Sequence, residues 1–317
     1  MPEAAYRRGQ QYLAAGSRDE AIESFRIAAY GPIGDFYVHR ALDRLAEKGQ
    51  DDGRAGANLR AAGSGSLVRP VKLNIESPTL PNPSQPWKER VIFFGMHGLE
   101  EAEWEALYQG QNLRNASNAH TTLVTLGMAG VGGTAMEFAR SLQFGENEYG
   151  QHRPERLLIE FPKAYWNEFV AMGRDTGLDP YFLLGLAKQE SLFRARAVSS
   201  AGATGVMQLM PTTADWMVDV ESAITRQHVA NLMHPSNSIR LGSHYMKRQV
   251  NTNNGNLVFA ACAYNAGSGN LRRWLREIPS DDLDAFIDRI PFSETRNFVK
   301  RVLGNYAAYR SLYAPED

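Results

Sequence analysis

Apolar residues recur at helical spacing through most of the chain, and this pattern predicts a mainly α protein. In the first third, small and aromatic residues follow the spacing of one helical-repeat pair: Gly9, Tyr12, Gly16, Ala21, Phe25, Ala28 and Pro32. The stretch GDFYVHRALDRLAEKG (34–49) predicts a further helix, with Phe36, Tyr37, Ala41 and Leu45 on one side. Because one helix pair cannot bury its own apolar face, we expect these helices to stack on others.

A change of composition divides the chain. Residues 61–87 are rich in Gly, Ser, Pro and Asn, and they predict an extended connecting loop. Helical periodicity resumes at 88–110, where Gly98 separates two helices, and a second helix pair follows at 120–142. The glycines of that pair fit no nucleotide-binding spacing and favour a helical hinge instead. Near Pro154 to Phe161 the pattern changes again, so we predict a helical-repeat or linker region at 1–155 and a second domain at 156–317.

The overall composition narrows the possible ligands. The chain is 43% hydrophobic and 22% charged, with a formal net charge of -1, which argues against nucleic acid as a ligand because phosphate binding rests on clustered Lys and Arg. No apolar run is long enough to span a bilayer, and the opening MPEAAYRRGQ has no signal-peptide core. The single cysteine, Cys262, cannot form an internal disulfide. We therefore expect a core role for Cys262 and no zinc site built on it.

An acid lies on an apolar helical face in the stretch GLDPYFLLGLAKQESLF (177–193). Asp179 is placed to cap this helix, and Pro180 suits its first position. The predicted apolar stripe consists of Leu183, Leu186, Ala187, Glu190 and Phe193. A carboxylate among apolar groups loses hydration, so we expect the pKa of Glu190 to rise, as a general acid requires. In the alternative interpretation Glu190 turns outward and pairs with Arg194, one helical turn on.

The loop RAVSSAGATGVMQLMPTT (196–213) follows this helix. Its glycines allow a ligand to approach the backbone closely, and Ser199 and Gln208 offer neutral hydrogen bonds. That chemistry suits hydroxyl and acetamido groups better than phosphates or ions. A surface turn leading into the next helix is the alternative.

Two further segments carry candidate residues. In LVFAACAYNAGSGNLRRWL (257–275) a helix ends near Tyr264 and Asn265, and we expect Gly267 and Gly269 to stop it. Tyrosine is a good platform for a sugar ring. In the alternative interpretation, Tyr264 belongs to the core and Asn265 caps the helix, which would give the same sequence pattern. In IPFSETRNFVKRVLGNYAAYR (290–310) we expect Ser293 to cap the helix. Glu294 in its first turn is explained by the helix dipole on this segment alone.

Taken together, these segments resemble those of a known family. The motifs GLDPYFLLGLAKQES, GATGVMQLMP, AACAYNAGSGNLRRWL and IPFSETRNFVKRVLGNY occur in the order and spacing of the soluble lytic murein transglycosylases. The stretches RVIFFGMHGLEEAEWEALYQG and IEFPKAYWNEFVAMGRDTGLDP resemble the family's superhelical linker. The resemblance extends from about Lys88 to the end. It implies a mostly helical, goose-lysozyme-like catalytic domain at 156–317, after a superhelical region.

The large ring-forming helical region and the export signal of full-length members are not visible in this sequence. We therefore expect the C-terminal part of a longer precursor, or a shortened member of the family.

The resemblance also assigns roles to particular residues. Glu190 matches the single catalytic acid/base, and Tyr264 matches the tyrosine that orients the carboxylate or the intermediate. Glu294 matches a glutamate at the cleft, which changes our expectation for it from a structural to a functional role. The implied substrate-binding residues are Ser191, Ser199, Gln208, Met210, Tyr264, Asn265 and Glu294.

The family's reaction needs one carboxylate, whereas hydrolysing glycosidases usually need two. In the family, the Glu protonates the oxygen between N-acetylmuramic acid and N-acetylglucosamine, then takes the proton of the C6 hydroxyl, which closes a 1,6-anhydro ring without water. Asp215 and Asp219 lie on the helix after the loop, and nothing in the sequence requires them to face a cleft. The resemblance thus implies peptidoglycan glycan strands as the substrate, without metal or cofactor, in the periplasm or cell envelope. Partners in cell-wall synthesis or secretion machinery stay open.

Three alternatives remain at this point. A lysozyme-type peptidoglycan hydrolase of the same fold would need an aspartate that positions water opposite Glu190. A non-catalytic cell-wall scaffold would use the helical repeats and keep a vestigial site. A general helical-repeat interaction module would explain the residues before 155 and none of the later motifs.

Overall fold

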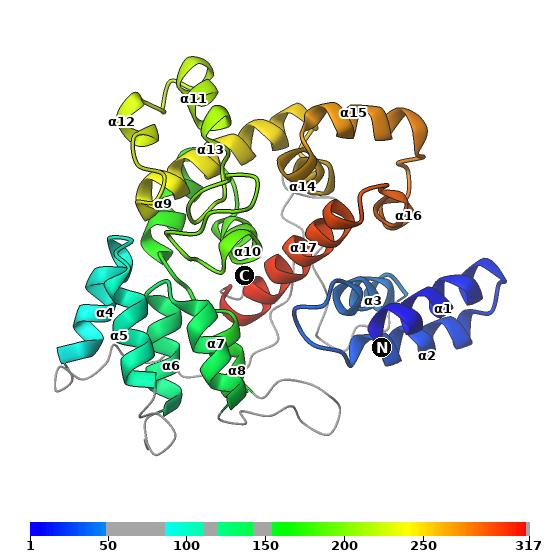
Figure 1. The fold of residues 1–317 in the computed structure, drawn as a ribbon. Helices are drawn as coiled ribbons and strands as arrows, with labels where there is room; N and C mark the ends of the chain where they lie inside the picture. Colours follow the sequence, from blue (N-terminus) through cyan, green and yellow to red (C-terminus); the bar gives the residue numbers. More distant parts are fainter. Residues whose placement is uncertain (49–85, 111–118, 142–153, 315–317) are drawn as a thin grey trace. The chain divides into compact units, whose positions relative to one another are not determined.

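The fold is mainly α, as the sequence predicts (Figure 1). The computed structural model describes residues 1–48, 86–110, 119–141 and 154–314, and within these ranges it contains 17 helices and no sheet, only isolated bridges that join Thr204 to Val198 and to Leu209. The helices are α1 Pro2–Ala14, α2 Arg18–Ala29, α3 Phe36–Glu47, α4 Pro86–Met96, α5 Glu101–Gly110, α6 Ala119–Met128, α7 Gly132–Ser141, α8 Pro154–Glu160, α9 Trp166–Thr176, α10 Pro180–Ser191, α11 Pro211–Val220, α12 Arg226–Val229, α13 Pro235–Thr252, α14 Leu257–Ala266, α15 Ser268–Glu277, α16 Leu283–Arg289 and α17 Ser293–Tyr313.

The chain forms two compact units. The first unit comprises residues 1–73, 146–152 and 246–317, and the second comprises 74–145 and 153–245. The division falls inside α13, after Tyr245. The domain boundary expected at residues 155–156 stays a prediction.

In the first unit, α1 and α2 form the helix pair that the repeat pattern predicts. The two helices approach closely because Gly9 has no side chain, since a Cβ there would lie 2.5 Å from the ring of Phe25. The pair packs against α3, and α3 packs against α17, where the backbone of Gly304 approaches that of Gly34. The expectation that the pair stacks on further helices is confirmed.

A buried polar network joins the N-terminal helices to α16. The Asp284 carboxylate is 4% exposed; it accepts hydrogen bonds from the Tyr6 hydroxyl at 2.7 Å and from Nε of Arg40 at 2.7 Å. Arg44 completes the network at 3.3 Å. Burial alone would raise the pKa of Asp284, but the hydrogen bonds and charges of its partners outweigh burial and hold this pKa below its ordinary value.

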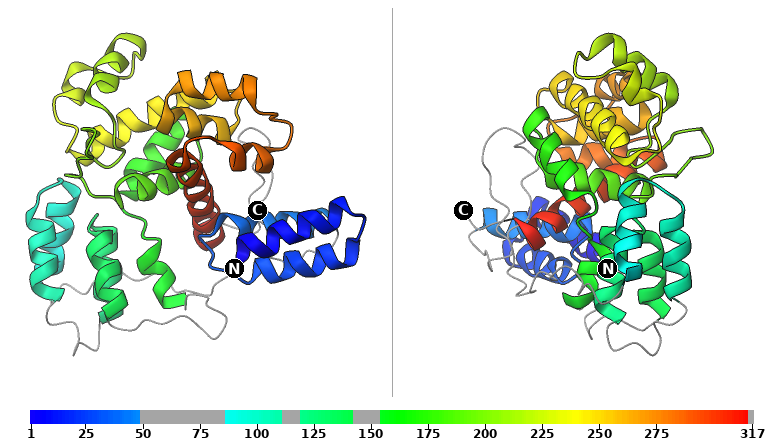
Figure 2. Two further views of the ribbon diagram at one scale, coloured as in Figure 1. Left: turned by 45° about the vertical axis from the view of Figure 1, so that its right-hand side comes forward. Right: turned by 90° about the vertical axis from the view of Figure 1, so that its left-hand side faces the viewer.

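In the second unit, the helix pairs α4–α5 and α6–α7 lie side by side, with α8 packed on the latter pair (Figure 2). Gly98 and Gly130 make the turns within these pairs. Their φ angles of 67° and 84° are left-handed, a conformation that glycine adopts more easily than residues with a side chain. Both predicted helix pairs are confirmed. The connecting loop predicted at 61–87 lies outside the described residues except for its last two, which begin α4.

Several local predictions can be checked against the helix ends. Asp179 caps α10 through the Tyr181 amide, and Pro180 occupies the first position, both as expected. Ser293 does not cap α17, because the residue at the cap position is Phe292. Gly267 ends α14 with φ of 83°, but Gly269 lies inside α15 and does not act as a stop.

Cys262 is fully buried and free, in agreement with a core role, and burial raises its pKa to about 12. Among the described helices, none combines the length and the hydropathy needed to cross a membrane.

Replacing Asp284 by Asn should destabilise the protein by about 1.5–3 kcal/mol, because its charged hydrogen bonds to the half-buried Arg40 and Arg44 are lost, while Arg40 keeps Asp43 and Arg44 keeps Glu47 as partners. The pKa of Asp284 is lowered on folding, so its stabilising effect is present above the unfolded-state pKa and is lost as the pH falls through the folded-state value. Urea unfolding at pH 7 and in acid measures both effects. The exposed Asp281→Asn serves as control, and equal losses in both variants would contradict the role of the network.

Candidate active site

Glu190 lies in the last turn of α10, one residue before the helix ends. Leu183, Leu186 and Ala187 on the predicted stripe are fully buried, and Glu190 is half-buried. The helical part of the stripe is therefore present, and it leaves Glu190 at the boundary between the core and the surface.

The helix ends earlier than the sequence predicts. Leu192 and Phe193 have φ of 53° and 65°, and they reverse the chain directly after Ser191. The Ser191 hydroxyl donates a hydrogen bond to the carbonyl of Val206 at 2.8 Å, which ties the helix end to the following loop. Arg194 therefore does not stand one helical turn after Glu190, as the outward-facing alternative for Glu190 assumes.

The loop at 196–210 is held by its own polar groups. Gln208, with φ of 47°, donates from its side-chain amide to the carbonyls of Ala197 at 3.0 Å and Gly205 at 2.9 Å. The Ser199 hydroxyl accepts from the amide of Ala203 at 3.0 Å. Met210 follows at the start of α11 and is exposed. Gln208 thus fixes the shape of the loop, and Ser199 and Met210 stand at its surface.

Lys188 is a charged group on the same helix that the sequence did not single out. Its ammonium lies 4.0 Å from the centre of the Phe161 ring. Burial lowers its pKa to about 8, against a smaller opposing effect of the Glu160 charge. No periodic signal pointed to this contact, because Phe161 belongs to a different segment of the chain.

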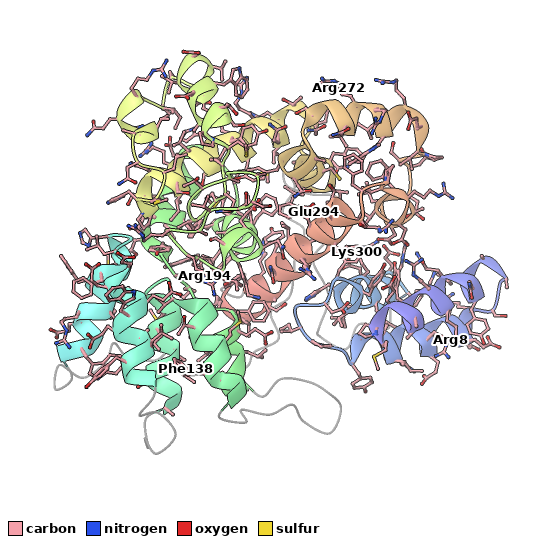
Figure 3. The ribbon with its side chains drawn as sticks, in the orientation of Figure 1. Arg8, Phe138, Arg194, Arg272, Glu294 and Lys300 are labelled. Carbon is pink, nitrogen blue, oxygen red and sulfur yellow. The ribbon has the colours of Figure 1, made fainter. Side chains whose placement is uncertain are left out.

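The remaining candidates lie in the first unit. Tyr264 and Asn265 occupy the last turn of α14, as predicted, and Asn265 accepts a hydrogen bond from the hydroxyl of Thr295 at 2.6 Å. Thr295 is buried in the first turn of α17, next to the exposed Glu294 (Figure 3). This hydrogen bond brings the Ala-Tyr-Asn segment and the start of α17 together within that unit.

The predicted site residues therefore form two groups. The second unit holds Glu190, Ser191, Ser199, Gln208 and Met210, and the first unit holds Tyr264, Asn265 and Glu294. Their functional roles stay predictions.

Two carboxylates that could serve a hydrolytic reaction have other partners. Asp215 and Asp219 of α11 both face Arg226, at 3.2 and 3.9 Å, and all three side chains are exposed. In the part of the chain that the structure describes, no three His, Cys, Asp or Glu side chains are grouped closely enough to hold a metal ion.

Comparison with known proteins identifies the domain around these residues. Residues 169–287 match the transglycosylase SLT domain. This segment includes Glu190, Gln208, Tyr264 and Asn265, and it ends before Glu294. The soluble lytic murein transglycosylase of Salmonella typhimurium is 36% identical over 157 residues, which cover 49% of this chain and 24% of that relative.

Solved structures share the fold over almost the whole chain. The 70 kDa soluble lytic transglycosylase of Escherichia coli superposes with a TM-score of 0.64 and 23% identity, over 98% of this chain and 46% of that one. An inactive Glu-to-Gln mutant of the lytic transglycosylase Slt from Pseudomonas aeruginosa superposes with a TM-score of 0.67 and 25% sequence identity. The match covers 99% of this chain and 47% of that one. This chain thus spans less than half the length of these proteins.

The fold and the matched segment define a mainly helical protein that carries a transglycosylase SLT domain. Residues 169–287 form a transglycosylase SLT domain, and the chain is similar to soluble lytic murein transglycosylases over about half of its length.

Replacing Lys188 by Met should change how stability depends on pH. The folded protein releases the Lys188 proton at about pH 8, whereas the unfolded chain holds it up to the ordinary pKa of 10.5. Between these values the unfolded state binds more protons, so the stability of the wild type should rise with pH relative to the variant, by roughly 1–3 kcal/mol. Urea unfolding from pH 7 to 10 measures this difference. Lys247→Met is the matched control, and parallel curves for wild type and Lys188→Met would refute the effect.

Proposed function

We propose that this protein is a peptidoglycan lytic transglycosylase, a lyase that cleaves the bond between N-acetylmuramic acid and N-acetylglucosamine without water. The observation that carries the proposal is the match of residues 169–287 to the transglycosylase SLT domain, with Glu190 at the end of a buried helix inside it. The relatives in this comparison are themselves named lytic murein transglycosylases. We place the catalytic domain at residues 156–317.

In the proposed reaction, Glu190 acts first as acid and then as base. Its carboxyl group donates a proton to the glycosidic oxygen, the bond from that oxygen to C1 of the muramic acid breaks, and the departing sugar leaves as an alcohol. The C6 hydroxyl then attacks C1, and its proton returns to the Glu190 carboxylate, so the catalyst is regenerated. A 1,6-anhydro ring forms, and no water is consumed.

The surroundings of Glu190 support a neutral sugar chain as the substrate. The loop after α10 presents hydroxyl, amide and thioether groups at Ser199, Gln208 and Met210, and such groups suit hydroxyl and acetamido substituents. Tyr264, Asn265 and Glu294 complete the proposed binding residues. This substrate would place the protein in the periplasm or cell envelope.

A hydrolytic reaction has less support. It would need a second carboxylate to position water, and the first two that follow Glu190 in the sequence, Asp215 and Asp219, form ion pairs with Arg226. The inactivity of a Glu-to-Gln mutant of the Pseudomonas aeruginosa protein supports an essential glutamate in either reaction.

The test is a digest of purified peptidoglycan whose products are weighed by mass spectrometry. The wild type should release fragments that end in 1,6-anhydromuramic acid, and Glu190→Gln should lower the rate by about 10²–10⁴-fold, because it loses general acid and base catalysis. Glu277→Gln, at an exposed position of α15, should retain the wild-type rate.

Other products would decide between the alternatives. Reducing-end fragments, one water heavier, would establish a lysozyme-type hydrolase. Full activity in Glu190→Gln would remove Glu190 from the mechanism, and a wild type without any products would favour a cell-wall scaffold.

A further inference from the structure

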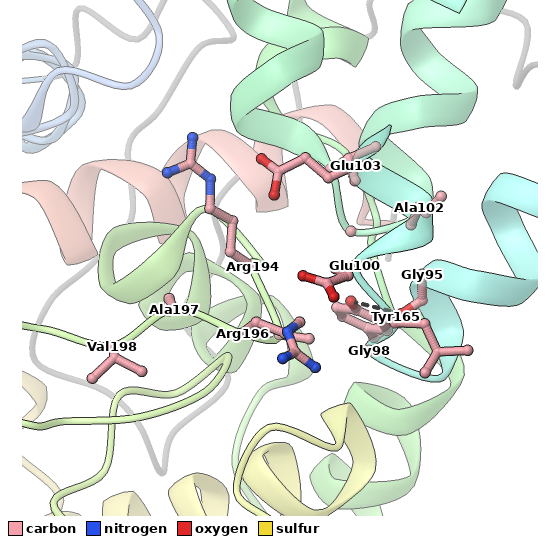
Figure 4. A pocket seen from close by; sticks show the side chains of 15 residues that line it. Gly95, Gly98, Glu100, Ala102, Glu103, Tyr165, Arg194, Arg196, Ala197 and Val198 are labelled. Atoms are coloured by element: carbon pink, nitrogen blue, oxygen red, sulfur yellow. Dashed lines mark hydrogen bonds between the residues drawn. The ribbon is translucent and has the colours of Figure 1, made fainter. Parts of the chain in front are cut away.

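A cavity of about 330 Å³ lies within the second unit (Figure 4). Its walls come from the α4–α5 turn, the α6–α7 turn with Tyr165, and the segment 194–198 that follows α10. The volume is at the lower end of the range of small-molecule sites. None of the residues assigned to the candidate active site lines it.

Close backbone approaches fix the walls. The Tyr165 hydroxyl donates a hydrogen bond to the carbonyl of Gly95 at 3.1 Å, and a Cβ at Gly130 would lie 2.1 Å from that hydroxyl. At Gly98 a Cβ would lie 2.6 Å from the carbonyl of Met233. Close packing at Gly98 and Gly130 therefore fixes the backbone on two sides of the cavity.

Four charged side chains line this cavity, two of each sign: Glu100, Glu103, Arg194 and Arg196. Arg194 and Glu103 extend from different elements toward the same part of the pocket (Figure 4). Within the described residues, none of the four has a charged partner of opposite sign within 4.0 Å. Glu103 accepts one long hydrogen bond, from Thr134 at 3.4 Å.

The cavity presents positive and negative side chains that do not pair with each other. Such a lining is complementary to a ligand that carries both a positive and a negative charge. We propose that this pocket binds a small zwitterion, in which a carboxylate and an ammonium group are joined by a short chain, as in an amino acid or the end of a short peptide. Arg194 binds the carboxylate with its planar fork of donors, and Glu103 accepts from the ammonium.

The remaining lining agrees with this ligand. Small apolar groups at Ala102, Ala129 and Val131 suit short aliphatic side chains. An inorganic anion would meet two carboxylates, and a neutral sugar would leave all four charges without partners. Neither of these ligands uses the whole set of charges.

One peptide group connects the pocket to the proposed substrate loop. Ala197 lines the pocket, and its carbonyl accepts hydrogen bonds from the Gly205 amide at 2.9 Å and the Gln208 side chain at 3.0 Å. A zwitterion in the pocket therefore lies beside the segment that fixes Gln208. A free peptide carries both charges at its ends, whereas a peptide joined to a glycan through its amino end would have to supply the ammonium from a side chain.

The experiment is a calorimetric titration of the full chain with four forms of trialanine. These are the free zwitterion, the N-acetylated form, the C-terminal amide and the doubly blocked peptide. The free zwitterion should bind saturably, and blocking either end should weaken binding by about tenfold or more, because each charged hydrogen bond is lost separately.

Substitutions on each wall assign the two ends of the ligand. Glu103→Gln should bind the free and N-acetylated forms equally, and Arg194→Gln should bind the free and amidated forms equally. Arg194→Lys, which keeps the charge, should retain part of the affinity. Arg272→Gln, an exposed position on α15 outside the pocket, should bind like the wild type (Figure 3). Circular dichroism establishes that each variant is folded.

A second series distinguishes the sources of the ligand. Glu190→Gln protein is titrated with a disaccharide–peptide fragment of peptidoglycan and with the same fragment after its peptide is removed. Binding of free trialanine would mean that a free peptide suffices. Binding of the peptide-bearing fragment alone, with the same sensitivity to Glu103→Gln and Arg194→Gln, would mean that the peptide is recognised on the glycan.

No saturable binding of any probe, or binding that both substitutions leave unchanged, would overturn the proposal. The inference does not depend on the proposed lyase reaction, because none of the candidate catalytic residues lines the pocket. A failed digest and a failed titration therefore test different claims.

Discussion

The abrupt end of α10 is the constraint on which the rest of the second unit depends. Two consecutive residues without glycine's freedom, Leu192 and Phe193, adopt left-handed backbone, at a cost of roughly 1–2 kcal/mol each. Burial of the Phe193 ring, 1% exposed, and the hydrogen bond from Ser191 to Val206 offset this cost. The reversal leaves Glu190 at the end of a helix. The residues that follow it first line the pocket, at 194–198, and then form the polar loop.

The carbonyl of Ala197 shows how closely these two places are joined. It accepts from the Gly205 amide and from the Gln208 side chain, so one rigid peptide group belongs to the cavity and to the loop at once. Since Ala197 is only seven residues after Glu190, the intervening chain has little freedom to absorb a shift. A shift of the cavity wall at Ala197 would therefore also move the loop that Gln208 holds.

Local signals were enough for much of the fold, and non-local contacts account for the rest. Asp179 and Pro180 mark the start of α10 because capping is decided within one turn. The early end of that helix was not predictable, since no glycine marks it and burial of Phe193 decides it. The bond from Tyr6 to Asp284 spans 278 residues, and no periodic pattern encodes such a contact. In the candidate site, the apolar stripe and the motif singled out Glu190, whose role stays a prediction, whereas the Lys188 contact and the cavity required the folded backbone.

The charges that face the cavity without pairing with one another are not explained by stability alone. Glycines at the helix turns bring backbone so close that an added Cβ at Gly130 would collide with Tyr165, which makes the walls tight. In the same place Arg194 and Glu103 face one cavity without forming an ion pair. An exposed ion pair is worth little, so closing this one would add little stability. A ligand that bridges the two charges would gain from both at once.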